Sequence, residues 1–471
     1  MRAARPALPY RSVSPDPVAQ NTMNTALKHS LLAAAVSAGF LATQASHAEP
    51  PAGTVTEQRT VGAFSAIELS GPYHVVVNAQ GRPGIELSGE RKQLEEVETV
   101  LRGNTLVVRP VERNGFNFSF GKRRDSVVIH ITAAQLGSLK MSGSGDVELD
   151  HVSGDRFALS IDGPGDLEAS GAVRELSVRV SGSGDADLHR IKAANVELSM
   201  SGPGDVHLSG VGNELVANLS GSGDLEGDDL RLARLHARLS GPGGMKLNGS
   251  SREVRAEVSG SGDFQACSLA AETVSTVQHG PGNACVGGAI RKLDALITGS
   301  GELNAAGLQA RTAVVRMDGP GNATLSGTVG ELNAILTGSG DLDAEELKVR
   351  KAVVKSQGPG TVELAQVEDT LDGELRGSGD LTATMSGKRL LLKMSGPGSA
   401  HIDGKVDLVR AQCSGSGSLE GRKLTAGRAD LAVSGPGSAA VNVAGRERRQ
   451  GAQLLVVDRS GSRQSAQYAP Q

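Results

Sequence analysis

The sequence predicts an all-β protein, a parallel β-helix or solenoid with coils of 19–20 residues. A glycine triplet recurs at that interval through most of the chain, and apolar residues alternate with polar ones on both sides of each triplet. The chain holds 63 glycines but only 2% aromatic residues and no Trp. A composition so poor in large rings indicates a thin core, in which each small layer is covered by the next one.

The triplet reads Gly-Ser-Gly or Gly-Pro-Gly, and its middle residue alternates between Ser and Pro from the first copy to the last. The sequence unit is therefore a double repeat of about 39 residues, present eight times. A fixed period of this kind is the signature of a repeat architecture. The 16 triplets begin at Gly143, Gly163, Gly182, Gly202, Gly221, Gly241, Gly260, Gly280, Gly299, Gly319, Gly338, Gly358, Gly377, Gly396, Gly415 and Gly435.

Strands are predicted on both sides of each triplet. Apolar residues stand two, four and six positions before the first glycine, as Leu176, Val178 and Val180 do before Gly182, and the alternation resumes after the triplet at Ala186. A period of two indicates a strand with one buried face. A further apolar position about nine or ten residues after the first glycine marks a third side of the coil. Stacked coils would pair as parallel strands about 4.8 Å apart, which gives 16 coils a length on the order of 75 Å.

We expect the triplet to form a tight corner. Glycine tolerates positive φ there and leaves room beside the next coil, where a Cβ atom would be crowded. Proline suits the middle position because its φ is fixed and its missing N–H is not needed at a corner. Interleaved serines would relieve crowding between stacked prolines, which is our hypothesis for the alternation.

Residues 1–48 are predicted to be an upstream extension followed by a signal peptide. The segment that opens at Met23 has Lys28, an apolar run from Leu31 to Leu41, and small residues before a cleavage point after Ala48. This pattern is typical of a secretory signal. We therefore expect an exported protein, periplasmic or secreted to the cell surface, with no membrane span in the mature chain.

Three further segments complete the predicted organisation. Residues 49–140 lack the period and hold Phe64, Tyr73, Phe116, Phe118 and Phe120, so we expect them to cap the exposed strand edges at the start of the solenoid. The solenoid itself is predicted over 141–440, and 441–471 is predicted to be one more strand near 454–457 followed by a disordered tail from residue 460.

The chain has three cysteines, Cys267, Cys285 and Cys413. Cys267 and Cys285 are 18 residues apart, nearly one coil, so a disulfide between neighbouring coils is one interpretation in an oxidising compartment. The alternative, which we favour from the sequence, is that all three are buried small hydrophobic residues.

The residue that follows the triplet is the candidate binding position. Stacking would align these residues into a carboxylate ladder, with the functional interpretation of cation or glycan binding. The structural interpretation, which we favour, is that an Asp after a tight turn accepts hydrogen bonds from local backbone N–H groups. Toward the C-terminus the slot holds Thr361, Ser399, Ser418 and Ser438 instead. The ladder comprises Asp146, Asp185, Asp224, Asp263, Asp341 and Asp380 at Gly-Ser-Gly corners, with Asp166, Asp205 and Glu302 in the same place.

The start of the array resembles the family of putative auto-transporter adhesin head domains, also called head GIN domains. The resemblance covers about residues 57–260 well and the rest as further repeats. It implies an exported β-helical protein of bacterial surfaces with an adhesin or glycan-binding role. The segments that carry it are 64–69 with Gly71 and 73–75, 103–108, and 128–131 leading through Leu136 and Leu139 into 142–146.

Other chemistries lack their motifs. The net charge of −4 is spread over interspersed acidic and basic residues, which disfavours nucleic acid as a partner. The sequence has no zinc-spaced cysteines, no phosphate loop and no Gly-x-Ser-x-Gly elbow. We therefore predict no catalytic, cofactor or metal residues, and a non-catalytic surface that binds a glycan or cell-envelope component. The alternative is a glycan-acting β-helix enzyme, lyase or hydrolase, which would use acidic residues on one face and would need loops that interrupt the array.

Overall fold

A computed structural model describes residues 54–111, 127–444, 453–457 and 463–467. The chain divides into two units, Met1–Pro51 and Ala52–Gln471, and the second is described below. The predicted upstream extension and signal peptide, with cleavage after Ala48, lie outside the described residues, as do Phe116, Phe118 and Phe120.

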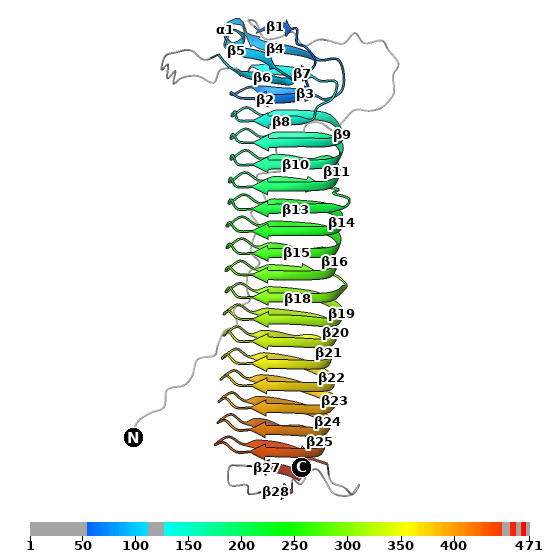
Figure 1. The fold of residues 1–471 in the computed structure, drawn as a ribbon, viewed down its shortest axis with the longest axis vertical. Coiled ribbons are helices and arrows are strands. Elements are labelled where there is room, and N and C mark those ends of the chain that lie inside the picture. Colours follow the sequence, from blue (N-terminus) through cyan, green and yellow to red (C-terminus); the bar gives the residue numbers. More distant parts are fainter. Residues whose placement is uncertain (1–53, 112–126, 445–452, 458–462, 468–471) are drawn as a thin grey trace, which may run out of the picture. The chain divides into compact units, whose positions relative to one another are not determined.

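The repeats form a parallel β-solenoid of about 15 turns, which confirms the predicted fold class (Figure 1). In most coils one long strand runs from a triplet, through a second corner, to the next triplet. Each strand pairs in parallel with its equivalents one coil away, so that Leu167 faces Val147 on one side and Ala186 on the other. The uninterrupted strands are β9 (Val147–Ile161), β10 (Leu167–Val180), β11 (Ala186–Met200), β14 (Leu225–Leu239), β15 (Met245–Val258), β16 (Phe264–Gln278), β19 (Leu303–Met317), β20 (Ala323–Leu336), β21 (Leu342–Ser356), β22 (Val362–Leu375), β23 (Leu381–Met394), β24 (Ala400–Cys413) and β25 (Leu419–Val433).

Two coils are interrupted at the second corner. In one, β12 (Val206–Ser209) and β13 (Glu214–Leu219) replace a single strand; in the other, β17 (Ala284–Gly287) and β18 (Ile290–Ile297) do so. Both interruptions are short, so the array continues through them without an inserted loop.

The triplet glycines are required by close approach between coils. A Cβ atom added to Gly182 would lie far inside van der Waals contact with the carbonyl oxygen of Gly163 in the preceding coil, and the other triplets show the same crowding. In the described chain none of the triplet glycines has a positive φ, so that part of our explanation was wrong and the steric part was right. The second glycine donates to the first glycine of the preceding coil, as Gly184 does to Gly163 at 3.1 Å.

In the described coils the positive-φ glycines stand instead near the second corner, in most cases eight residues after the first glycine of a triplet. Gly-Pro-Gly coils have them at Gly171, Gly210, Gly249, Gly288, Gly327 and Gly404, and a Gly-Ser-Gly coil has Gly307. The 20-residue coils have one more residue at this corner: Glu168 faces Asp187, but Ser170 faces Arg190. Two kinds of second corner therefore alternate, and they account for the alternating coil length.

The core is one continuous aliphatic cluster that runs the length of the stack. Inward side chains from the alternating positions are almost fully buried, and Phe157 and Phe264 are the largest of them in the coils. Each layer is thin and covered by the next, as the composition predicts.

At the N-terminal end the parallel ladder gives way to antiparallel strands. β2 and β3 form a first coil that pairs in parallel with β8 and β9, and on its other side with β6 and β7. β5 then pairs antiparallel to β6, β4 to β7, and β1 to β4. The bounds are β1 (Thr54–Arg59), β2 (Ala66–Leu69), β3 (His74–Asn78), β4 (Gly84–Glu90), α1 (Arg91–Leu94), β5 (Val97–Arg102), β6 (Thr105–Pro110), β7 (Val128–Thr132) and β8 (Ser138–Met141).

The C-terminal end also turns antiparallel. β26 (Ala439–Val443) pairs in parallel with β25, but antiparallel with β27 (Gln453–Val457), which pairs with β28 (Arg463–Gln467). β28 lies in the segment for which we expected a disordered tail.

Among the described residues, no helix has the length and hydropathy that a membrane crossing requires.

Candidate binding face

The residues that follow the triplets line one edge of the solenoid, and each Asp among them accepts a hydrogen bond from the next coil. The Oδ1 atom of Asp166 accepts the backbone N–H of Asp185 at 2.9 Å, Asp185 accepts that of Asp205 at 2.8 Å, and Asp205 accepts that of Asp224 at 2.7 Å. The same bond, from each Oδ1 to the ladder N–H of the following coil, is made by Asp146, Asp224, Asp263, Asp341 and Asp380.

These bonds cross from coil to coil, whereas we expected them within one turn. Asn283 and Asn322 occupy the same slot and make the same bond through their amide oxygens, to Glu302 and Asp341, each at 2.9 Å. We had left both out because only acidic residues were considered. The bond therefore needs an acceptor oxygen but no charge, and the Asp side chains have a second oxygen that it does not use. One coil has Gly244 in the slot and stacks without this bond.

Surface hollows follow the ladder. One of about 270 Å³ lies between two columns of outward side chains, with Asp185, Asp205 and Asp224 in the ladder and Asp187, His207 and Glu226 in the next column. A second, of about 220 Å³, continues the face among Asp263, Asn283, Glu302, Gln265 and Asn304. Both present polar groups at the spacing of the coils.

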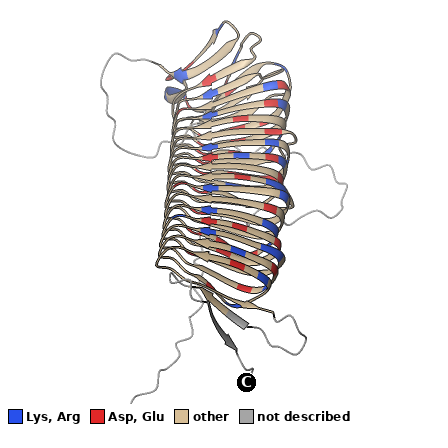
Figure 2. Ribbon diagram, turned by 60° about the horizontal axis from the view of Figure 1, so that its bottom comes forward, with Lys and Arg blue, Asp and Glu red and all other residues tan. Residues whose placement is uncertain are grey.

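The ladder face is most acidic in the N-terminal coils. The coils as a whole carry both signs (Figure 2). Several of these acids have partners with nitrogen donors: His207 lies 3.1 Å from Asp228, Lys246 lies 3.2 Å from Glu226, and Arg190 pairs with Glu168. The outward acids of this region are Asp146, Glu148, Asp150, Asp166, Glu168, Asp185, Asp187, Asp205, Asp224, Glu226 and Asp228.

Two of these carboxylates are held in their charged form. Hydrogen bonds from Asn248 and His207 lower the pKa of Asp228. Burial acts to raise the pKa of Asp187, but hydrogen bonds and charge from His189 outweigh it, so that the pKa is lowered overall. A general acid of a glycosidase needs the opposite shift. In the described coils, moreover, no three His, Cys, Asp or Glu side chains are arranged to hold a metal ion.

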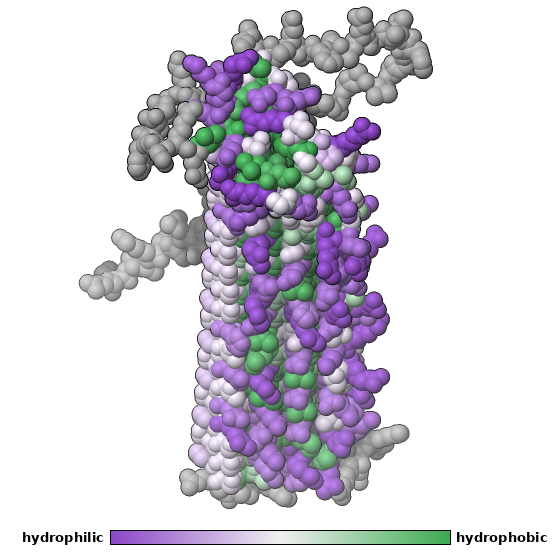
Figure 3. All heavy atoms as spheres, turned by 45° about the horizontal axis from the view of Figure 1, so that its top comes forward, coloured by the Kyte–Doolittle hydropathy of each residue, from purple (hydrophilic) through white to green (hydrophobic). Residues whose placement is uncertain are grey.

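The face before the triplets carries apolar side chains that we did not single out from the sequence. Figure 3 shows hydrophobic residues among hydrophilic ones along the coils. A hollow of about 390 Å³ on this face is lined by residues that include Val216, His236, Arg238, Arg255 and Val277. The signal was present in the sequence as apolar residues at outward positions of the alternation: Val277, Leu296, Val314, Ile335, Val353 and Leu391, all half-buried.

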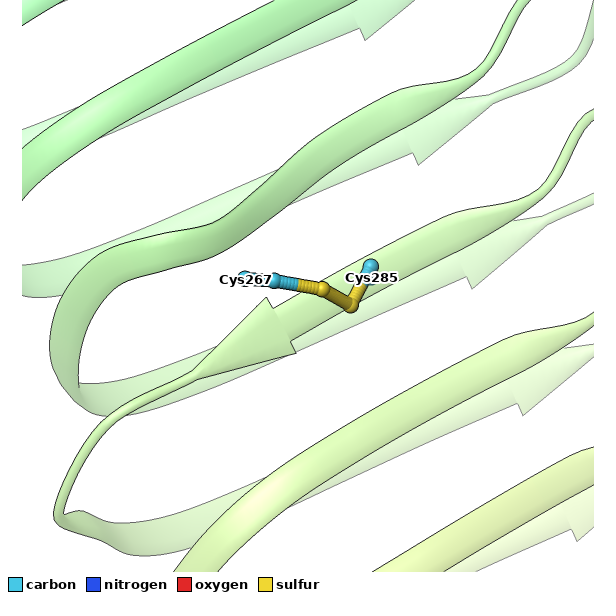
Figure 4. Close-up of a disulfide and its surroundings, with 2 residues drawn as sticks. All are labelled: Cys267 and Cys285. Carbon is cyan, nitrogen blue, oxygen red and sulfur yellow. A yellow bond between two sulfur atoms is a disulfide. The ribbon is translucent and has the colours of Figure 1, made fainter. Parts of the chain in front are cut away.

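Cys267 and Cys285 lie on the solvent side of neighbouring coils, with Cα atoms 5.2 Å apart, and the structure joins them as a disulfide (Figure 4). Cys267 is exposed and Cys285 half-buried, so our favoured expectation of three buried cysteines is wrong for these two. Cys413 is buried and free, and burial raises the pKa of its thiol.

Comparison with solved structures finds similar chains of low identity. A putative lipid binding protein from Parabacteroides distasonis ATCC 8503 is 16% identical, with 70% of this chain and 97% of that chain covered and a TM-score of 0.31. A putative adhesin from the same organism is 15% identical, with 62% and 96% covered and a TM-score of 0.32. A putative adhesin from Bacteroides fragilis NCTC 9343 is 14% identical, with 75% and 98% covered and a TM-score of 0.21.

Comparison with curated proteins gives no match. A family model, described as putative auto-transporter adhesin, head GIN domain, matches residues 63–266, 217–307, 286–384 and 369–448. These matches take in the N-terminal strands from β2 onward and all 16 triplets, well beyond residue 260, where the clearest part of the sequence resemblance ends. The chain therefore belongs to the putative auto-transporter adhesin head GIN domain family.

Proposed function

We propose that this chain is an exported, non-catalytic adhesin-like solenoid whose ladder face binds a glycan or another cell-envelope component. Membership of the adhesin head family supports the adhesin-like role. The observation that carries the binding face is the row of polar hollows beside the ladder, which repeat with the coils. A polymer with repeated hydroxyl groups would contact several coils at once, so that individually weak contacts add.

The free oxygens of the ladder and the next outward column would make these contacts. Asp205 and Asp224 have one oxygen committed to the backbone and one left for a ligand hydroxyl, and Asp187 and Glu226 complete the other wall. Carboxylates that stay charged accept strong hydrogen bonds from sugar hydroxyls. The lowered pKa of Asp187 supports this role.

A non-catalytic role is favoured by the regularity of the array. The longer gap within a described coil separates Ser209 from Glu214, and it leaves no inserted loop with which to wall off a pocket. Enzymes on repetitive scaffolds build their sites from such loops. An acid and base pair would also require one carboxyl group with a raised pKa, and Asp187 and Asp228 are shifted the other way.

A glycan array tests the proposal. The purified chain should bind a subset of glycans, and the combined variant Asp187→Asn, Glu226→Gln should weaken binding at least ~tenfold, because it removes charged acceptors from one wall. Glu257→Gln, in the hollow on the other face, is the matched control and should bind normally. Binding that survives the double variant would contradict the assignment of the face, and release of cleaved sugar in a parallel assay would contradict the non-catalytic role.

Export is a separate part of the proposal. It is supported by the signal pattern that ends at Ala48. N-terminal sequencing of the protein from the producing cells should begin at Glu49, and fractionation should find it outside the cytoplasm. A cytoplasmic chain that retains the residues before Ala48 would contradict export.

A further inference from the structure

We propose that the Cys267–Cys285 disulfide is a reducible clasp that holds together two locally weakened coils of the solenoid. It bridges β16 and β17, which belong to neighbouring coils. Cys267 is exposed, so a reductant in solvent can reach its sulfur. The integrity of these central coils would then depend on the redox conditions around the chain.

The clasp spans a stretch where pairing between the coils is lost. Ala266 faces Val286 and Ala270 faces Gly287, so the three residues from Cys267 to Leu269 have no partner on β17. The following coil is also interrupted there, between the end of β17 at Gly287 and the start of β18 at Ile290. The disulfide thus supplies a covalent connection where backbone hydrogen bonds are missing.

The core beneath the same strand is weakened by polar side chains. Gln278 and Thr276 of β16 are almost fully buried at positions that most coils fill with apolar residues. Gln278 donates to the carbonyl of Glu302 at 3.0 Å, but its Oε1 atom and the Oγ1 atom of Thr276 have no partner in the structure. A buried polar atom without a partner lowers stability.

The other interrupted coil shows what the clasp adds. There β12 and β13 are separated by a similar gap, but no cysteine is near and the adjoining core positions hold Leu198 and Met200. That coil combines a broken corner with an apolar core. The coil at β17 combines a broken corner with buried polar residues in the adjoining strand β16, and it is the one with a disulfide.

The opening reaction is thiol–disulfide exchange with a dithiol. A thiolate of the reductant attacks Sγ of Cys267, the Sγ–Sγ bond breaks, and Cys285 leaves as a thiolate that takes up a proton. The second thiol of the reductant then displaces Cys267 from the mixed disulfide. The protein gains two electrons and two protons, and the reductant is released as its own disulfide.

Hydrogen exchange of the purified chain with and without dithiothreitol tests the clasp. Peptides from residues 264–290 should exchange at least ~tenfold faster after reduction, while peptides over β12 and β13 keep their rates. Cys267→Ser should show the fast rates without reductant and no further change with it. Cys413→Ser is the control and should respond to reduction as the unaltered chain does.

Gln278→Leu tests whether the disulfide stabilises these coils because their core is weakened. Because it fills the core under β16, it should largely remove the acceleration that reduction causes. The proposal is overturned if exchange over residues 264–290 is the same in both redox states, if all coils accelerate equally, or if Cys267 and Cys285 are alkylated before any reductant is added.

Discussion

The N-terminal and C-terminal coils have the same backbone but different ladders. From Asp146 to Asp224 the slot after the triplet is acidic in every coil, whereas Ser399, Ser418 and Ser438 fill it near the end. The strands stack in parallel in both regions: β10 and β11 pair with one register shift at the second corner, and β23 and β24 pair without a shift. Stacking is therefore set by the glycine and apolar columns, and the charge of the ladder is free to differ between regions and to serve binding.

The largest effect is expected at the glycine column, and it should be equal in both regions. Gly182→Ala and Gly396→Ala each drive a Cβ atom into the carbonyl oxygen of the preceding coil, so each should cost about 3 kcal/mol or more of unfolding free energy. Chemical denaturation measures it. Ser183→Ala, at the exposed middle of the same triplet, should be neutral. A large loss of unfolding free energy in only one region would show that the glycine column does not set the stacking equally in both.

A slightly smaller effect is expected in the apolar columns. Leu198 and Leu390 are both fully buried, one in each region, and replacement by Ala should cost about 2–5 kcal/mol through lost burial and a cavity. The same denaturation experiment applies. If the Leu390 variant lost far less, the C-terminal coils would have a looser core than the structure shows.

The ladder itself should contribute modestly. Asp205→Ala leaves the N–H of Asp224 without its acceptor and should cost about 1 kcal/mol, while Asp205→Asn keeps an acceptor oxygen and should cost close to nothing. Ser418→Ala should cost less than Asp205→Ala, because the bond from Ser438 is longer, at 3.3 Å. A loss for Asp205→Asn equal to that for Asp205→Ala would show that charge matters to stacking.

The smallest effect is expected in the pH dependence of the free energy of unfolding, through the carboxylates of the N-terminal ladder face. The folded-state pKa of Asp228 is lowered, so its contribution is present above its unfolded value near 3.8 and is lost as pH falls through the lower folded value. The group is largely exposed, so we expect less than about 1 kcal/mol. Asn248→Ala should reduce the loss of stability below pH 4. Asn213→Ala, which removes a bond between two amides, should leave it unchanged.

Much of the fold could be predicted because the same sequence pattern recurs in every coil. The triplets and the alternation around Gly182 determine the strands, the inward columns and the parallel stacking. The role of the glycines was only half predicted. A sequence shows where glycine recurs, but whether the reason is positive φ or a close neighbour depends on how one coil sits on the next, as Gly163 and Gly182 illustrate.

The candidate site was predicted in position more than in chemistry. The position of the ladder follows from the sequence, because its residues come directly after the triplets. Its hydrogen bonds run to the following coil, and the period of the sequence does not show which backbone N–H group lies close enough to donate. Asn283 and Asn322 could have been recognised by asking for an oxygen acceptor and not for a charge. The outward positions of Cys267 and Cys285 could have been inferred, because each follows an inward alanine, Ala266 or Ala284, in the period-two alternation.

The middle residue of the triplet has a practical consequence. In the coils that the structure describes, it donates no backbone hydrogen bond, and Ser and Pro serve equally well there. The middle positions therefore form a column of replaceable residues, one per coil and about 4.8 Å apart. Cross-linkers, probes or short foreign peptides could be attached along this column at chosen intervals.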